Sequence, residues 1–463
     1  MRVPPLAVTT PAAHRALAGK RALVMGLGSF GGGAGAVRYL AGLGARVVAT
    51  DTRPAAGLAR TLAELADLPI EFVLGQHRRS DFEAAEIVVV NPAVRPSDPL
   101  LAAARAAGAR LTTEIELFLE AVRARVVAIT GTQGKSSTTH ATHALLTGCG
   151  RRAHLGGNIG GSLLPALPSI QENDFVVLEL SSYQLESLGG ARTAARAEAV
   201  AVVNILPDHL ERHGTLAAYA AAKQRILELL KPGGHALLPL DDERFASWTV
   251  AGVKLGFSTR DTGRGLFLRA GEFRLDDEVL GSVSDLALPG DFQRANALVA
   301  LGLARVLGLD SAGLARALPL VRGLEHRLQD LGVVRGRHVI DNAVSTTPDS
   351  TVSALLALPT GTVLVLGGRE KRLPLAELCQ VARQRVAHAV AFGEAGPAFA
   401  AALARAGVPV EVTASLEQAL PIALARGAPG AHLLFSPAGS SFDAYANFQE
   451  RASAFRAALQ ALR

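Results

Sequence analysis

The chain has 463 residues, of which 49% are hydrophobic and 19% charged, and this composition predicts a globular protein of two to four domains. It has only two cysteines and no apolar run long enough to span a bilayer, which argues against a disulfide framework and a membrane protein, so we expect a cytoplasmic location. The net charge of +6 suits an anionic partner such as a nucleotide, but 5% aromatic residues do not predict nucleic-acid binding.

Short apolar segments alternate with helical segments along most of the chain. The predicted strands are 21–25, 46–50, 87–90, 125–130, 174–180, 199–205, 235–238, 338–340, 362–366, 389–392 and 432–435. Residues 250–290 are predicted to form short, turn-rich strands, and 292–307 a helix. This alternation predicts parallel sheets with helices on their faces, in three α/β domains.

A glycine-rich turn, Gly26-Leu-Gly28-Ser-Phe-Gly31, directly follows the first predicted strand, and Asp51 ends the second. A tight turn, a helix start and an acidic residue in this order are typical of a dinucleotide-binding fold. What the pattern specifies is a diphosphate beside a sugar. It therefore leaves NAD and a UDP-sugar as open alternatives.

A second glycine loop lies in residues 128–140, AITGTQGKSSTTH, between a predicted strand and a helix. The usual phosphate-binding loop has four residues between its glycines, whereas Gly131 and Gly134 enclose two. Backbone N–H groups of such a loop can hold phosphate, Lys135 can reach terminal phosphates, and Ser136 can ligate Mg²⁺. The loop alone leaves an accidental turn as an equal alternative.

Polar residues at the end of a later strand favour a nucleotide site. Glu179 ends a buried segment, and Ser181, Ser182 and Gln184 follow it at once. A carboxylate at such a strand end is a common ligand of the Mg²⁺ that accompanies a nucleotide.

Further candidates lie on loops and in a helix. Asp208 and His209 follow another strand. Lys223 is predicted to begin a helical segment, where a solvated side chain is the ordinary alternative. His326 and Arg327 form a basic pair at a domain junction, where they can approach phosphates.

The chain resembles the Mur ligase family, ATP-dependent enzymes that add amino acids to the peptidoglycan precursor. The resemblance is carried by motifs in one order, TGTQGKSS, GGNIGGSLL, ELSSYQLE, DHLERHG…AAK, EHR, LGGREK and SPAGSSFDAYANFQERA. VATDTRP, LGGREK and SSFDAYANFQERA are most similar to the branch that adds glutamate to UDP-N-acetylmuramoyl-L-alanine. The resemblance implies a monomeric acid–amino-acid ligase acting in peptidoglycan synthesis. It also implies a Rossmann-like UDP-binding domain over 1–113, a central ATP-binding domain over 114–322 and a Rossmann-like glutamate-binding domain over 323–463.

The resemblance also implies a role for each matching residue. The residues implied for ATP are Gly131, Thr132, Gly134, Lys135, Ser136, Ser137, Gln293, Asn296, Arg327 and Asn342. Those implied for the UDP-linked substrate are Gly28, Ser29, Phe30, Gly31, Asp51, Thr52, Arg53, Asn158, Ser181 and Gln184. Those implied for glutamate are Thr346, Lys371, Ser441 and Phe448.

Two Mg²⁺ ions are implied near the phosphate loop. Their implied ligands are Ser136, Glu179, His209 and Lys223, the last as a carbamate. The implied catalytic set is Lys135, Glu179, His209, Lys223 and Arg327.

Two stretches depart from the family's pattern. The family's Asn-Asp-Ser-Lys-Ala-Thr reads Asp-Asn-Ala-Val-Ser-Thr over 341–346, so Asn342 takes the usual aspartate position and Val344 the usual lysine position. Asn91 opens NPAV in place of Ser-Pro-Gly. The segment 346–348 resembles a branch that includes L-glutamate-adding enzymes, so D-glutamate is expected with L-glutamate as the alternative. An NAD-dependent oxidoreductase and a non-catalytic nucleotide-binding regulator remain as hypotheses from other classes.

Overall fold

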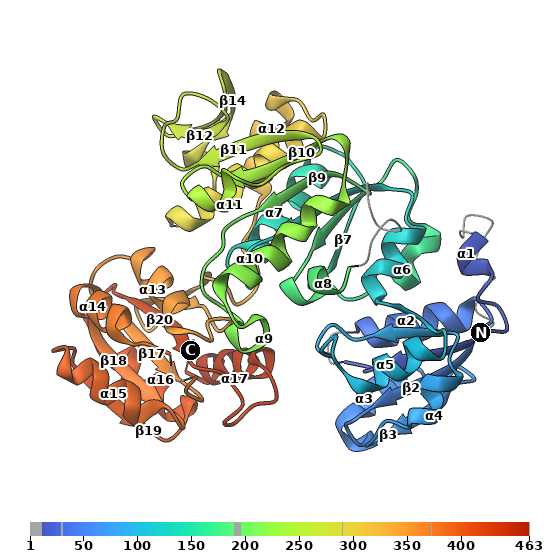
Figure 1. Ribbon diagram of the computed structural model, residues 1–463. Coiled ribbons are helices and arrows are strands. Elements are labelled where there is room, and N and C mark those ends of the chain that lie inside the picture. Colours follow the sequence, from blue (N-terminus) through green and yellow to red (C-terminus); the bar gives the residue numbers. More distant parts are fainter. Residues whose placement is uncertain (1–11, 29–30, 189–195, 289, 372, 463) are drawn as a thin grey trace. The chain divides into compact units, whose positions relative to one another are not determined.

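The computed structural model describes residues 12–28, 31–188, 196–288, 290–371 and 373–462 (Figure 1). The chain divides into two compact units. The first comprises Met1–Asp285 and Ala295–Leu320, and the second Leu286–Arg294 and Val321–Arg463. None of the helices in the described ranges has the length and hydrophobicity needed to cross a bilayer.

The first unit begins with a five-stranded parallel sheet in the order β3-β2-β1-β4-β5. Its strands are β1 (Arg21–Met25), β2 (Arg46–Asp51), β3 (Glu71–Leu74), β4 (Ile87–Val90) and β5 (Arg110–Thr112). The helices of this segment are α1 (Ala12–Arg15), α2 (Gly32–Gly42), α3 (Ala59–Glu64), α4 (Arg79–Ala84) and α5 (Pro99–Ala106). Because the strand order reverses between β1 and β4, the loops after these two strands flank the usual ligand-binding crevice.

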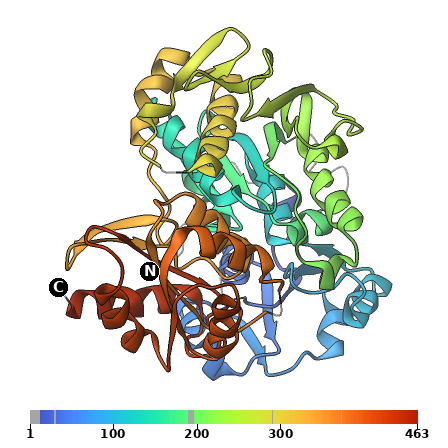
Figure 2. The same ribbon diagram turned by 90° about the vertical axis from the view of Figure 1, so that its left-hand side faces the viewer.

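A nine-stranded sheet forms the rest of the first unit, in the order β14-β13-β12-β11-β10-β9-β6-β8-β7. Its strands are β6 (Arg125–Thr130), β7 (Ala153–Gly157), β8 (Phe175–Glu179), β9 (Ala197–Val202), β10 (Leu230–Pro239), β11 (Val253–Ser258), β12 (Leu266–Arg269), β13 (Glu272–Leu275) and β14 (Glu278–Ser282). Pairing is parallel except along β12, β13 and β14, the olive strands at one edge in Figures 1 and 2.

The helices that accompany this sheet are α6 (Glu114–Ala121), α7 (Lys135–Gly148), α8 (Ser182–Ser187), α9 (Leu210–His213), α10 (Leu216–Gln224), α11 (Asp291–Val306), of which Asp291–Arg294 belong to the second unit, and α12 (Ser311–Ala317). Strand β6 lies between β8 and β9, and all three run parallel. The segments that leave their carboxyl ends are therefore neighbours. Those segments contain the phosphate loop, Glu179 and His209.

The second unit contains a six-stranded sheet in the order β15-β16-β20-β17-β18-β19. Its strands are β15 (Gln329–Val334), β16 (Arg337–Asp341), β17 (Thr362–Gly367), β18 (Val386–Phe392), β19 (Val410–Thr413) and β20 (His432–Ala438). Only β15 among these described strands runs antiparallel to its neighbour. The helices are α13 (Pro348–Leu356), α14 (Ala376–Arg385), α15 (Gly396–Arg405), α16 (Leu416–Ala425) and α17 (Phe448–Ala461).

The strands predicted from the sequence are present, with ends that differ by a few residues, and the predicted helix over 292–307 is α11.

The position of Lys223 differs from the prediction, which puts this residue at the start of a helical segment. The residue lies near the end of α10, and a 3₁₀ turn, Arg225–Leu229, follows. Its side chain is buried, because helix α10 turns this face toward the loop after β6.

Within the first unit, helix α2 packs closely at Gly35 against the segment after β7 that contains Ser162. A Cβ atom at Gly35 would lie 2.3 Å from both Cβ and Oγ of Ser162. We expect Gly35→Ala to lower the free energy of unfolding by about 1–3 kcal/mol, because a packed interface tolerates an extra methyl group poorly. Urea denaturation followed by tryptophan fluorescence and circular dichroism measures this change.

Gly32→Ala is the matched control, since a Cβ there meets nothing within 4 Å. It is expected to leave the stability unchanged or slightly increased. Ser162→Gly in the Gly35→Ala background should recover part of the loss. Equal stabilities of the two alanine variants would contradict the close contact.

Candidate active site

The short glycine loop is a turn that tolerates no side chain at its last glycine. Gly134 caps α7 with left-handed backbone angles, φ 78° and ψ −10°. A Cβ atom there would lie 2.3 Å from Oδ1 of Asn296, which accepts a hydrogen bond from Thr138 at 3.3 Å. The side chain of Asn204 accepts bonds from the backbone N–H groups of Thr132 and Gln133 at 3.1 and 2.9 Å. The loop is thus held open at the N-terminus of a helix, where backbone N–H groups favour an anion.

The loop's own polar side chains lie in the first turn of α7. The Nζ atom of Lys135 donates to the carbonyl oxygen of Thr132 at 2.8 Å. Ser136 is half-buried, and the buried Oγ of Ser137 makes no hydrogen bond to any described residue. The sequence-predicted phosphate-binding residues therefore come together in one turn.

Glu179 has the features of a metal-binding carboxylate. Its side chain is 1% exposed at the end of β8, and Oε1 accepts a hydrogen bond from Nδ2 of Asn158 at 2.7 Å. Its Oε2 atom is buried and receives no hydrogen bond from the described part of the chain. A buried carboxylate oxygen left in this way is costly unless a cation or a donor binds it.

Lys223 carries a buried amino group beside the phosphate loop. The residue is 1% exposed, and Nζ donates to the carbonyl oxygen of Gly131 at 2.7 Å. Nζ also lies 4.6 Å from the centre of the Tyr219 ring. Burial, with the nearby charge of Lys135, lowers the pKa of Lys223 to about 7. The amino group is therefore substantially neutral near neutral pH.

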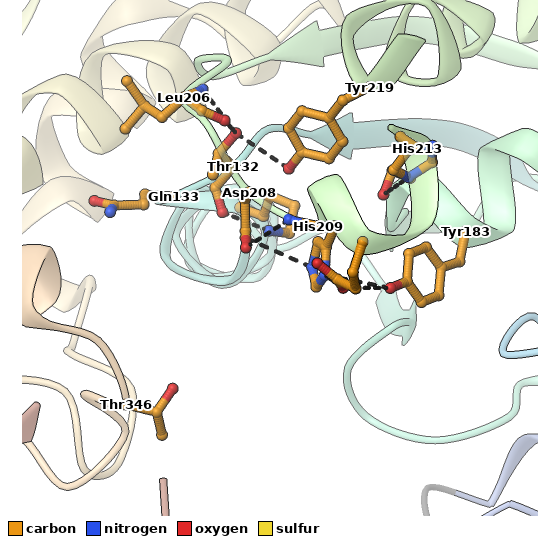
Figure 3. Close-up of polar contacts among 12 residues, drawn as sticks. Thr132, Gln133, Tyr183, Leu206, Asp208, His209, His213, Tyr219 and Thr346 are labelled. Atoms are coloured by element: carbon orange, nitrogen blue, oxygen red, sulfur yellow. Dashed lines mark hydrogen bonds and ion pairs between the residues drawn. The ribbon is translucent and has the colours of Figure 1, made fainter. Parts of the chain in front are cut away.

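His209 stands before the single helical turn α9, with a left-handed backbone at φ 52° and ψ 33°. Its Nδ1 atom is hydrogen-bonded to the hydroxyl of Tyr183 at 3.3 Å, and Nε2 lies 3.5 Å from a carboxylate oxygen of Asp208. Figure 3 shows the rings of Tyr183, His209, His213 and Tyr219 gathered around this point, and adjacent ring centres are 5.1–6.3 Å apart.

No group of three or more His, Cys, Asp and Glu side chains among the described residues is arranged to hold a metal ion. Mg²⁺ does not require such a group, because it is usually bound through one or two carboxylates together with phosphate oxygens and water. The buried Oε2 of Glu179 meets this requirement, and Ser136, His209 and a modified Lys223 can add to it.

A cavity of about 350 Å³ extends from the first sheet to this group within the first unit. At one end it is lined by Gly26, Gly28 and the loop 91–93, and at the other by Lys135, His209 and Lys223. Further lining residues are Glu114, Asn158, Ser162, Ser181, Tyr183, Gln184 and Tyr219. The cavity thus connects the glycine turn directly with the phosphate loop.

The remaining residues predicted for the UDP-linked substrate differ in their placement. Asp51 accepts hydrogen bonds from the backbone N–H of Leu27 at 3.0 Å and from the guanidinium of Arg53 at 3.0 Å. Burial acts to raise the pKa of Asp51, but these bonds outweigh it and lower the pKa. Asp51 thus fixes the glycine turn. Asp51, Thr52 and Arg53 are not among the described residues that line the cavity, and Ser29 and Phe30 lie outside the described residues.

In the second unit, three loops leave neighbouring carboxyl ends of β16, β20 and β17. The Nζ atom of Lys371 donates to Oγ1 of Thr346 at 3.2 Å, so two of the residues predicted for glutamate are in contact. Ser441 follows Ser440, whose backbone pairs with Arg369 at 2.8 and 2.9 Å. Phe448 begins α17.

A buried guanidinium holds these loops together. Arg451 is fully buried and donates to the carbonyl oxygens of Gly439 at 2.9 Å and Ala343 at 3.3 Å. A Cβ atom at Gly368 would lie 2.8 Å from the same guanidinium. Burial lowers the pKa of Arg451 to about 10. Local pattern could not reveal this role, because the contacts span up to 108 residues of sequence.

The stretch 341–346, which begins at the end of β16 and departs from the family's pattern, has a structural explanation. Asp341 accepts bonds from Nδ1 of His326 at 2.8 Å and from Arg456 at 3.0 Å. Asn342 is buried, with its carbonyl accepting from the N–H of Leu328 at 3.2 Å and its amide donating to Ser436 at 3.0 Å. The side chain of Asn342 is thus engaged within the second unit. Arg327 lies between His326 and Leu328, and Gln293 precedes Asn296 by one turn of α11.

Sequence reasoning did not assign the lining residues Glu114, Ser162, Tyr183 and Tyr219. Glu114 accepts a hydrogen bond from Ser162 at 2.5 Å, and burial raises its pKa to about 7. From the sequence, the loop at Asn91 is only a departure from the family's pattern. Its position after β4, beside the switch in strand order, is the signal that could have identified it.

Three family models match the chain. They are described as the Mur ligase MurD-like N-terminal domain over residues 20–113, the Mur ligase middle domain over 129–304 and the Mur ligase glutamate ligase domain over 326–439. The chain is 36% identical over 459 residues to a protein named UDP-N-acetylmuramoylalanine–D-glutamate ligase from Roseiflexus sp. (strain RS-1), covering 95% of this chain and 98% of that protein. It is also 36% identical to the protein of the same name from Geobacter metallireducens, covering 96% and 98%.

Solved structures show the same fold at lower identity. UDP-N-acetylmuramate-alanine ligase from Thermotoga maritima has a TM-score of 0.64 at 18% identity, covering 96% of this chain and all of that chain. UDP-N-acetylmuramoylalanyl-D-glutamyl-2,6-diaminopimelate–D-alanyl-D-alanyl ligase from Acinetobacter baumannii has a TM-score of 0.60 at 18% identity, covering 91% of this chain and 86% of that chain. The prediction of three α/β domains is confirmed.

We expect Arg451→Met to lower the free energy of unfolding of the second unit by about 2–4 kcal/mol, because it leaves buried carbonyl groups without donors. Hydrogen exchange followed by mass spectrometry should show the loss in the segments 343–346, 368–371 and 439–441. Arg383→Met, on an exposed position of α14, is the control and should change stability by less than about 0.5 kcal/mol. Equal effects of the two variants would contradict this role of Arg451.

Proposed function

The chain belongs to the Mur ligase family, and on that premise we propose that it joins D-glutamate to UDP-N-acetylmuramoyl-L-alanine while converting ATP to ADP and phosphate. The observation that carries the substrate assignment is the continuous cavity from the glycine turn to Lys135. A diphosphate-linked sugar bound at the turn can extend its acyl end to the phosphate loop. Membership of a ligase family along most of the chain disfavours the NAD-dependent oxidoreductase.

The reaction needs a better acyl donor than a carboxylate. A carboxylate oxygen of the UDP-linked substrate attacks the γ-phosphorus of ATP, which gives an acyl phosphate and releases ADP. The amino group of glutamate then attacks the acyl carbon, loses a proton, and phosphate leaves. Positioning and charge neutralisation are the main tasks in such a phosphoryl transfer.

The phosphate loop supplies most of that positioning. Its backbone N–H groups, Lys135, Ser136 and Ser137 bind the phosphates of ATP, supported by the open helix N-terminus. Asn296 lies against Gly134, which supports its proposed role in binding the nucleotide. Arg327, Gln293 and Asn342 are the further residues proposed for ATP. Since the amide group of Asn342 is hydrogen-bonded within the second unit, we propose that Asn342 acts by shaping the loop 341–346.

Mg²⁺, when bound, would neutralise charge on the phosphoryl group that is transferred. We propose that Glu179, His209, Lys223 and Ser136 hold two such ions together with the phosphates. Asn158 orients the carboxylate of Glu179. Intact Lys135, Glu179, His209 and Lys223 also disfavour a non-catalytic regulator.

The loops of the second unit are proposed to bind the incoming glutamate. Thr346 and Lys371 are in contact, and a lysine ammonium is suited to a carboxylate. Ser441 and Phe448 complete the proposed site.

We also propose that the enzyme is a monomer, because all the proposed groups come from one chain. We propose that it acts in the cytoplasm, because its proposed substrates are ATP and a UDP-linked sugar.

The enantiomer is tested by measuring ADP release with D- and L-glutamate in parallel. We expect release to require both UDP-N-acetylmuramoyl-L-alanine and glutamate, and to be at least about tenfold faster with D-glutamate, a transition-state preference of about 1.4 kcal/mol. Faster release with L-glutamate would transfer the assignment to the L-glutamate-adding variant. Release that is indifferent to both substrates would refute the ligase.

We propose that Lys223 reacts with CO₂ to form a carbamate, which requires the neutral amine. With its pKa lowered to about 7, the amine is mostly neutral at pH 8 and mostly protonated at pH 6. After removal of CO₂, bicarbonate should therefore restore turnover several-fold more at pH 8 than at pH 6. Carbon-13 NMR with labelled bicarbonate should show a carbamate signal that Lys223→Met lacks. The same signal in both proteins would exclude Lys223 as the site.

A further inference from the structure

Arg212 connects the metal-binding edge of the central sheet with the first sheet. It lies in α9, three residues after His209, and its side chain is 6% exposed. The guanidinium donates to the carbonyl oxygens of Ala93 and Val94 at 3.1 Å and of Pro92 at 3.4 Å. It also forms an ion pair with Glu186 at 2.9 Å. Its burial and its several fixed acceptors distinguish Arg212 from an arginine that only projects into solvent.

Helix α9 cannot hold its own conformation. It has four residues, which is too short for a stable isolated helix. His209, immediately before it, has a left-handed backbone that disfavours a residue with a side chain by about 1–2 kcal/mol. External contacts must therefore fix this turn. Arg212 provides several of them, and Arg95 adds another by donating to the carbonyl oxygen of Glu211 at 3.2 Å.

A second connection runs from Arg212 to the His209 ring. The guanidinium carbon lies 4.8 Å from the centre of the Tyr183 ring, which is a cation–π distance. The hydroxyl of Tyr183 is hydrogen-bonded to Nδ1 of His209 at 3.3 Å, a contact visible in Figure 3. Arg212 thus constrains both the backbone and the imidazole of His209.

Two of the three residues whose carbonyl groups Arg212 binds, Pro92 and Ala93, line the cavity. Asn91, Pro92 and Ala93 line it, and so does His209. The side chain of Asn91 lies against the glycine turn, since Cβ atoms at Gly26 and Gly28 would approach it to 2.9 and 3.0 Å. A ligand bound on the turn and this loop therefore acts on the acceptors of Arg212.

We infer that Arg212 is a positioning residue that couples occupation of the nucleotide-sugar end of the cavity to the placement of His209 for metal binding. This inference rests on the function proposed above. A ligand that orders the loop 91–94 fixes the acceptors of Arg212, and Arg212 then holds α9 and the Tyr183–His209 contact. Because such coupling is reciprocal, the bound metal increases the affinity for the nucleotide sugar by the same factor.

The test measures binding and does not depend on turnover. Mn²⁺ has ligand preferences similar to those of Mg²⁺, and its binding to the full-length chain can be followed by electron paramagnetic resonance. Without ATP, we expect saturating UDP-N-acetylmuramoyl-L-alanine to tighten Mn²⁺ binding about tenfold in the wild type. In Arg212→Lys the tightening should fall below about twofold, because an ammonium cannot bind the carbonyl groups and the carboxylate together.

Arg225→Lys is the matched control. Arg225 also binds backbone carbonyls, those of Glu186 and Leu188, and pairs with Glu228, but its recorded partners do not include the loop 91–94. It should retain the tenfold tightening. If Arg212→Lys does not fold, Tyr183→Phe interrupts the same connection at the His209 ring. It should lower the tightening at least threefold, and an unchanged value would overturn the inference.

The outcomes separate this inference from the proposed function. Tightening that persists in a folded Arg212→Lys variant, or a wild type that turns over but shows no tightening, overturns the role of Arg212 and leaves the ligase intact. A wild type that neither binds UDP-N-acetylmuramoyl-L-alanine nor releases ADP with glutamate refutes the ligase itself. A merely structural arginine would lower stability without changing the ratio of the two Mn²⁺ affinities.

Discussion

The buried amino group of Lys223 is the constraint around which the functional edge of the first unit is arranged. An ammonium without a carboxylate partner is costly to bury, and the recorded acceptor of Lys223 is the carbonyl oxygen of Gly131. The fold therefore favours a neutral amino group at this point. That contact ties α10 to the phosphate loop, and the Tyr219 ring beside it joins the cluster that surrounds His209.

Much of this architecture is visible in the sequence, because buried parallel strands and glycine turns leave local signals. The strands and the loop before Lys135 follow from such signals, and the order of the motifs predicts that Glu179 and His209 belong to one site. Local pattern fails where a residue's environment comes from distant segments. Lys223 looks like a solvated helix residue, yet its partner Gly131 is 92 positions away. The contacts of Arg212 with the loop 92–94 span up to 120 positions.

The second unit illustrates the same division. Sequence motifs indicate Thr346, Lys371 and Ser441 but not what holds their loops in place. Neighbouring strand ends bring the loops to one edge, and Arg451 fills the space between them with donors. The exchanged order of Asp341 and Asn342 also has a physical basis, since each side chain satisfies polar groups of its own unit. The departure from the family's pattern therefore preserves a folded loop.

One glycine on the cavity wall has a consequence for inhibitor design. Gly157 lines the cavity with φ 92°, and a Cβ atom there would lie 2.2 Å from the carbonyl oxygen of Glu179. A compound that contacts this backbone meets a position where a side chain cannot be added without moving the chain. Any substitution of Gly157 that obstructs the compound would also displace the backbone of Glu179.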